Sequence, residues 1–198
     1  MTGKREAETL FECFCDTNQS SWQTVPIGQT RTPDYLVALS GEAVYVEVKQ
    51  LDADEAFRTP SGVSSRTVGS HVRQKITDSR KQIQAEAKAG SPGILLIYNN
   101  LDPMQLFGTE THDFISAMYG EMAVRLKGNK IKDSFYGRNS SLREGHNTSF
   151  SAVGHLRDST TGPTVRLYEN VFARNPLDFA SLPSCIEVVR IEVVESAA

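Results

Sequence analysis

The chain has 198 residues, of which 39% are hydrophobic and 23% charged, and its formal net charge is −3. This composition is ordinary for a globular protein, and the length allows a sizeable core without disulfides or metals to hold it together. No apolar run approaches the roughly 20 residues of a membrane span, and residues 1–15 are too polar and acidic for a signal peptide. We therefore expect a single cytoplasmic domain over residues 1–198, with no membrane partner.

The cysteines and the distribution of charge say more about the class of protein. Cys13, Cys15 and Cys185 are odd in number and lack zinc-site spacing, so reduced structural thiols are expected. Residues 57–90 hold seven Lys/Arg against two Asp/Glu, and residues 125–147 hold six against two. Two basic segments in an otherwise acidic chain suit a phosphate-binding cleft, although a charged helix face and a solvated loop would give the same pattern.

Hydrophobic periodicity and turn residues predict the elements of the first half, which forms the core of the domain at about residues 3–100. They are a helix at 3–16, a strand at 22–27, a hairpin at 32–50, a polar loop at 51–70, a helix at 71–89 with Ser70 as its N-cap, and an apolar strand at 94–98. Helix, loop and strand after the hairpin allow a parallel crossover.

The second half, about residues 105–198, is predicted as a β-rich extension of the same domain. Its expected elements are a helix at 111–119, a hairpin at 122–126 and 131–136, a basic loop at 137–147, and strands at 149–156, 165–171 and 186–194. The predicted fold class is α/β (α+β), with a mixed β-sheet flanked by helices and additional C-terminal strands.

The hairpin at 32–50 brings three chemical groups together. With a two-residue turn at Ser40-Gly41, Asp34 falls directly opposite Glu47, and Lys49 points to the same face because side chains alternate along a strand. Two neighbouring carboxylates can hold a hard cation such as Mg²⁺, and a lysine can act on an attacking water. The alternative is a strand pair with solvated charges on its open face.

The same residues resemble a known family. Pro33-Asp34, twelve intervening residues, then Glu47-Val48-Lys49 is similar to the motif of the PD-(D/E)XK nuclease superfamily, whose fold is restriction-endonuclease-like. The resemblance implies that Asp34 and Glu47 ligate metal and that Lys49 assists the attacking water. Segments 147–153 and 173–177 also resemble uncharacterised bacterial proteins with this hairpin, which carries no assigned chemistry.

The family often adds residues from two helices. The resemblance implies a glutamate from the first helix as a third metal ligand, and the apolar stripe favours Glu8 over Glu12, with a surface role as the alternative. It also implies a Gln or Lys from the helix after the Glu-x-Lys strand, for which Lys75 and Gln82 are the candidates. The expected nucleic-acid contacts are Arg73, Lys75, Gln82, Arg138 and Arg143.

These residues predict a metal-dependent nuclease that hydrolyses phosphodiester bonds, with DNA favoured over RNA as substrate. Mg²⁺ is the expected cofactor, Mn²⁺ could substitute for it, and a homodimer is a candidate assembly because cutting two strands often needs two copies. The alternative function is a catalytically inactive module of the same fold that binds nucleic acid or a protein partner.

Overall fold

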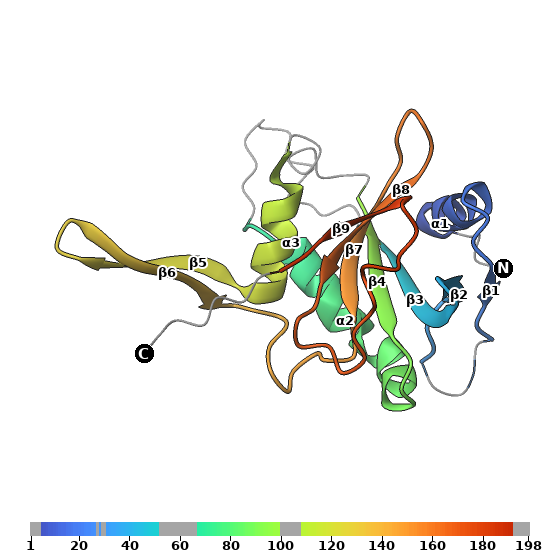
Figure 1. Cartoon of the computed structure of the whole chain (residues 1–198), viewed down its shortest axis with the longest axis horizontal. Coiled ribbons are helices and arrows are strands. Elements are labelled where there is room, and N and C mark those ends of the chain that lie inside the picture. Colours follow the sequence, from blue (N-terminus) through green and yellow to red (C-terminus); the bar gives the residue numbers. More distant parts are fainter. Residues whose placement is uncertain (1–4, 27, 29–30, 52–66, 100–107, 192–198) are drawn as a thin grey trace, which may run out of the picture.

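The computed structural model describes residues 5–26, 28, 31–51, 67–99 and 108–191 (Figure 1). Residues 52–66, most of the predicted loop, lie outside the described residues. The helices are α1 (Glu6–Thr17), α2 (Ser70–Lys88) and α3 (Glu110–Tyr119). The strands are β1 (Trp22–Thr24), β2 (Tyr35–Leu39), β3 (Glu42–Gln50), β4 (Gly93–Tyr98), β5 (Glu121–Lys127), β6 (Lys130–Arg138), β7 (Ala152–Arg157), β8 (Thr164–Glu169) and β9 (Ile186–Val189). None of the helices in the described ranges combines the length and apolar character needed to cross a bilayer.

Seven strands form one mixed sheet in the order β1-β2-β3-β4-β7-β8-β9, and β5 and β6 form a separate pair. The strands β3, β4 and β7 run parallel to one another, β2 and β8 flank them as antiparallel neighbours, and β9 runs parallel to β8. α2 lies in the connection between β3 and β4, as a parallel pair requires. The prediction of a mixed α/β fold with added C-terminal strands is confirmed.

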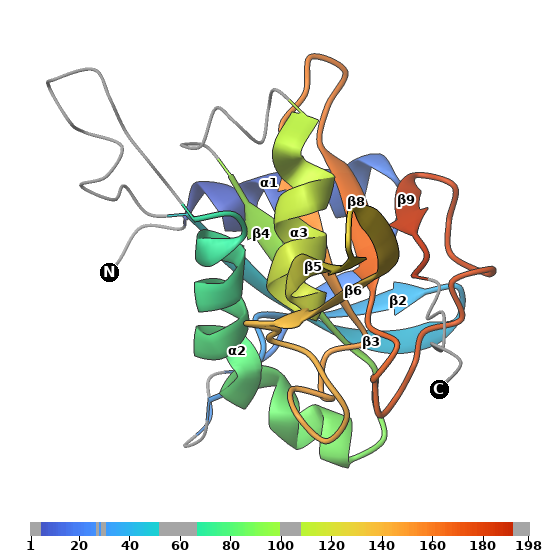
Figure 2. The ribbon, with the colours of Figure 1, turned by 90° about the vertical axis from the view of Figure 1, so that its left-hand side faces the viewer.

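Helices cover both faces of the sheet: α1 lies on one side, and α2 and α3 lie on the other (Figures 1 and 2). Phe14 of α1 is buried in one apolar cluster with Ile94, and Ile76 of α2 is buried in the second with Leu95. Since β4 is covered on both faces, its residues form the continuous apolar run Gly93–Tyr98.

The β2–β3 hairpin has the predicted register. Ser40 and Gly41 form a two-residue turn with φ of +52° and +85°, and Leu39 pairs with Glu42. Two positive φ values match the right-handed twist of the strands in such a turn. The apolar face of the hairpin joins the cluster beneath α1, so the opposite face, toward α2, carries the remaining side chains.

Two predicted boundaries are corrected. α2 begins at Ser70 itself, and its cap is Gly69 at φ +68°. Gly69 is required there because an added Cβ would lie 2.6 Å from the Asp113 carbonyl oxygen, while its own N–H donates to Asp113 Oδ1 at 3.0 Å. Arg138, expected in a loop, is the last residue of β6, because pairing with Glu121 extends that strand.

Candidate functional site

Asp34, Glu47 and Lys49 lie on the sheet face that α2 covers. Tyr35, the first residue of β2, pairs with Val46, and the preceding residue, Asp34, lies close enough to Glu47 for their charges to interact. Asp34 Oδ2 accepts a hydrogen bond from the backbone N–H of Val48 at 2.8 Å, which fixes the carboxylate against β3. Lys49 Nζ forms an ion pair with Glu47 Oε1. The predicted convergence of these three side chains on one face is therefore confirmed.

Glu47 is held in an unfavourable environment for its charge. The residue is 1% exposed, and its Oε2 is buried with no hydrogen-bond partner among the residues that the structure describes. Burial, followed by the charge of Asp34, raises the pKa of Glu47 to about 7, although the neighbouring Lys49 acts in the opposite direction. A buried carboxylate oxygen without a partner marks a place where a cation or a water would be stabilising.

These groups suit a divalent cation held by two carboxylates. Asp34 and Glu47 supply the hard oxygen ligands that Mg²⁺ prefers, and Mg²⁺ commonly uses only one or two carboxylates and keeps several waters. The unpartnered Glu47 Oε2 is the observation that supports this fit. Over the part of the chain that the structure describes, no group of three or more His, Cys, Asp or Glu side chains is arranged for a metal ion.

The two glutamates considered as a third ligand belong to α1, which packs on the other face of the sheet. Glu8 is half-buried, and its Oε2 accepts from the backbone N–H of Arg5 at 3.4 Å, as in a helix capping box. Glu12 Oε1 accepts from the Tyr35 hydroxyl at 2.8 Å. Burial, followed by the carboxylate of Glu12, raises the pKa of Tyr35. A metal-binding role for Glu8 stays a prediction.

α2 brings polar side chains to the face that carries Glu47. Gln82 is half-buried and its Oε1 has no hydrogen-bond partner, and the same holds for the fully buried Ser79 Oγ. Lys75 is also half-buried. Arg73 has a structural contact, because its Nη2 donates to the carbonyls of Val68 and Ser116 at 3.3 Å. The sheet face that carries Glu47 is thus covered by a helix, α2, that also has buried polar atoms.

A basic hollow adjoins the start of this hairpin. It is lined by Arg31, Lys81, Gln84, Ala85 and Lys88. Arg31 precedes Asp34 by three residues, and the other lining residues come from α2. The described residues that line the hollow include three cations and no acidic side chain, so the hollow can attract the phosphates of a ligand that approaches the hairpin.

The second basic segment is divided by the fold. Arg138 ends β6, whereas Arg143 lies in the loop after it, where its backbone N–H donates to the His146 carbonyl. The neighbouring Leu142 N–H donates to the Met118 carbonyl at 2.8 Å, which ties this loop to the end of α3. Residues 125–136 of this segment belong to the hairpin that was predicted, and β6 continues two residues further, to Arg138.

No protein-family model, curated protein or solved structure matches this chain. The likeness of its hairpin to the nuclease motif therefore remains a resemblance, and the functional argument rests on the geometry of the site.

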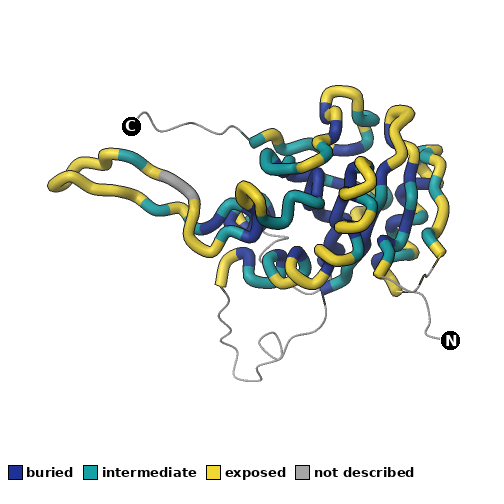
Figure 3. The backbone as a smooth tube through the Cα atoms, turned by 90° about the horizontal axis from the view of Figure 1, so that it is seen from below, coloured by how far each residue is buried: buried dark blue, intermediate teal, exposed yellow. Residues whose placement is uncertain are grey.

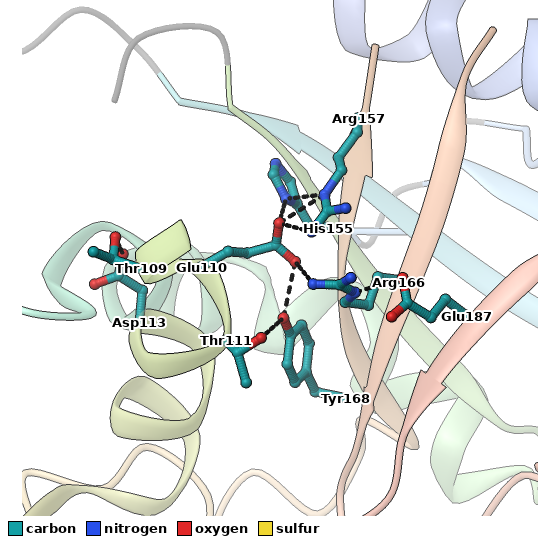
Figure 4. Close-up of polar contacts among 9 residues, drawn as sticks. All are labelled: Thr109, Glu110, Thr111, Asp113, His155, Arg157, Arg166, Tyr168 and Glu187. Atoms are coloured by element: carbon teal, nitrogen blue, oxygen red, sulfur yellow. Dashed lines mark hydrogen bonds and ion pairs between the residues drawn. The ribbon is translucent and has the colours of Figure 1, made fainter. Parts of the chain in front are cut away.

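A second polar cluster, which was not predicted, shares the sheet face of Lys49 (Figure 4). The pairings Lys49–Ile97, Ile97–His155 and His155–Arg166 form one row across β3, β4, β7 and β8. At the end of this row the carboxylate of Glu110, the first residue of α3, is 3% exposed.

Cationic and hydroxyl groups surround Glu110. Its Oε2 lies 2.7 Å from His155 Nδ1 and pairs with Arg157, and its Oε1 accepts from the Tyr168 hydroxyl at 2.8 Å. Arg166 Nη1 lies 3.4 Å from Oε1. Burial acts to raise the pKa of Glu110, but these contacts, led by His155, lower it to about 2. The cluster fixes the start of α3 on β7 and β8. The alternating His-x-Arg and Arg-x-Tyr patterns of those strands are its only trace in the sequence.

Proposed function

We propose that this chain is a metal-dependent nuclease that hydrolyses phosphodiester bonds of nucleic acid, DNA rather than RNA. The observation that carries the proposal is the proximity of the Asp34 carboxylate to a buried Glu47, one of whose carboxylate oxygens has no hydrogen-bond partner among the described residues, beside Lys49.

Each side chain has a defined task in this proposal. Asp34 and Glu47 would hold Mg²⁺, or Mn²⁺ in its place. When bound, such a cation polarises the phosphodiester and lowers the pKa of a bound water. Lys49, which contacts Glu47, would orient the attacking water and offset the negative charge that builds on the phosphate. The Val48 N–H holds Asp34 in place for this role.

Substrate would approach through the basic hollow at Arg31, Lys81 and Lys88, because its positive charges attract phosphates. We include Lys75 and Gln82 as candidate contacts, since both are half-buried on α2. Cytoplasmic residence is also part of the proposal. The three cysteines are free thiols, as a reducing compartment favours.

Cleavage of labelled DNA and RNA in Mg²⁺ or Mn²⁺ tests the proposal. Alanine at Asp34, Glu47 or Lys49 should slow cleavage by two to three orders of magnitude, because a lost transition-state interaction is worth roughly 3–4 kcal/mol. The matched control is Glu42→Ala, which removes an exposed carboxylate from the same strand. Cleavage that persists in the Asp34 and Lys49 variants would refute the assigned site.

Binding measured in Ca²⁺, which tolerates looser coordination than Mg²⁺, separates the enzyme from an inactive binding module. If the chain is a nuclease, the wild type should bind nucleic acid in Ca²⁺. Each of the three alanine variants should then lose less of its binding than of its cleavage activity. Wild-type protein that binds duplex, single-stranded or branched substrates but never cuts any of them would favour the module.

A further inference from the structure

The β5–β6 hairpin, residues 121–138, projects from the body of the protein as a two-stranded ribbon (Figures 1 and 3). Its contacts with other described helices and strands are mainly with α3. Gly120, at φ +97°, sets the angle at its base, because an added Cβ would lie 2.5 Å from the Arg138 carbonyl oxygen. A lone two-stranded hairpin is only marginally stable in water. The side chains that this hairpin exposes therefore indicate what it could bind.

One face of the ribbon is apolar and open to solvent. Met122, Val124 and Leu126 alternate along β5, and Ile131 of β6 pairs with Leu126. These residues are 56%, 46%, 62% and 71% exposed, and they are four of the five exposed large hydrophobic residues in the described part of the chain. Exposed apolar side chains that lie together on a protein surface often mark an interaction site.

The tip of the ribbon is basic. Residues 121–138 hold five Lys/Arg against two Asp/Glu, a net charge of +3 in a chain whose total is −3. Asp133 lies 3.2 Å from Arg125 across the ribbon, so that acid is already paired with a cation. Three exposed lysines surround the tip: Lys127, Lys130 and Lys132. The last of these is the extra residue of a bulge, which turns it out of the strand ladder.

We propose that this ribbon binds in a groove of double-stranded DNA. The lysines at the tip would contact phosphates, and the apolar pair Leu126–Ile131 would lie against base edges and sugars. The major groove of B-DNA admits a two-stranded ribbon, and apolar side chains can contact the thymine methyl groups there. The deep, narrow major groove of A-form RNA does not admit one. The proposal rests on the proposed function only for its substrate class and deepens it to duplex DNA.

A second copy of the chain is a poorer occupant. Stable interfaces bury about 800 Å² on each partner and involve about 20–30 residues a side, whereas the apolar face offers four side chains. A two-fold contact between ribbons would also bring lysine-rich tips of equal charge into one assembly, which is unfavourable. Charge therefore selects an anionic partner.

The test measures binding of a labelled DNA duplex in Ca²⁺ from about 50 to about 200 mM salt, since each lost phosphate contact reduces the slope of log K against log salt by about 0.9. The triple variant with Lys127, Lys130 and Lys132 changed to Gln should flatten that slope by up to about 3 and bind more than about tenfold more weakly at the lowest salt. The double variant with Leu126 and Ile131 changed to Ser should bind DNA more weakly at every salt concentration, and the slope of log K against log salt should stay unchanged.

Matched controls lie elsewhere on the surface. Arg174→Gln removes an exposed cation and Val68→Ser an exposed hydrophobic residue, and neither should change binding. Ribbon variants with wild-type affinity and slope would overturn the inference, even if the wild type cleaves DNA. Sedimentation that shows a wild-type dimer dissociated by the serine variant would overturn it in favour of a second copy. Ribbon-dependent binding without any cleavage would support the ribbon and contradict the nuclease.

Discussion

Replacing Glu47 by glutamine should stabilise the metal-free protein. Glu47 is 1% exposed, and burial, followed by the charge of Asp34, raises its pKa from 4.5 to about 7. Each pKa unit is worth about 1.4 kcal/mol, so ionised Glu47 destabilises the folded state by about 3 kcal/mol relative to the unfolded chain. Glutamine keeps the shape of the side chain and removes the charge.

The pH dependence has a definite sign. The folded protein holds this proton more tightly than the unfolded chain, so the stability it contributes is complete below pH 4.5 and is lost as the pH rises through about 7. The advantage of Glu47→Gln should therefore grow from less than about 1 kcal/mol at pH 5 to about 3 kcal/mol at pH 8. Urea unfolding of both proteins in EDTA at the two pH values measures it.

Glu42→Gln, on the exposed part of the same strand, is the control and should show no such change. A Glu47→Gln variant that is less stable than wild type at pH 8, or an advantage that does not vary with pH, would refute the reasoning. Adding Mg²⁺ should stabilise the wild type more than the variant, because a ligand that binds only the folded state raises its stability.

Three further substitutions test the surrounding structure by urea unfolding. The pKa of Glu110 is lowered from 4.5 to about 2, so its contribution is present above pH 4.5 and is lost as the pH falls toward 2. Glu110→Gln should cost about 3 kcal/mol at pH 7 and little near pH 2, and equal losses at both would contradict this. Gly69→Ala should lower the unfolding free energy by more than about 1 kcal/mol, because its φ is +68° and a Cβ would meet the Asp113 carbonyl; an unchanged midpoint would be the contrary result. Tyr35→Phe removes the hydroxyl that donates to Glu12 and should cost about 1 kcal/mol, so a gain in stability would contradict the role of that bond.

The β2–β3 hairpin could be predicted from the sequence because the residues that determine its turn and its pairing lie close together along the chain. The turn at Ser40-Gly41 fixes the loop length, and loop length fixes which residues face each other. The pairing of Asp34 with Glu47 follows from that alone, and the structure has the same register. The periodicity of α2 and the apolar run of β4 were equally readable, since each is set by its own few residues.

The second polar cluster could not be predicted because its members come from distant parts of the chain. Glu110 begins α3, whereas its partners His155 and Tyr168 lie on strands far along the sequence. Only the sheet order brings them together. The face chosen by α1 was also undetermined, because one amphipathic helix fits either side of a sheet.

The β5–β6 ribbon shows a different limit of prediction from the sequence. Its turn at Gly128-Asn129 and its alternating strands were predicted and are present. Alternation would ordinarily place Met122, Val124 and Leu126 on a buried face. In the structure these residues are exposed, because the pair extends beyond the sheet and no described helix or strand covers this face.

The central claim is that Asp34 and Glu47 hold a divalent cation, and calorimetric titration of Mn²⁺ in buffers of different ionisation enthalpy tests it most directly. Because the pKa of Glu47 is about 7, Mn²⁺ binding at pH 6 should release nearly one proton from this carboxyl, and binding at pH 8 should release almost none. Asp34→Asn and Glu47→Gln should each weaken binding by at least about tenfold, and the glutamine variant should also abolish the proton release. Wild-type protein that binds no Mn²⁺, or Mn²⁺ binding that neither substitution changes, would contradict the account.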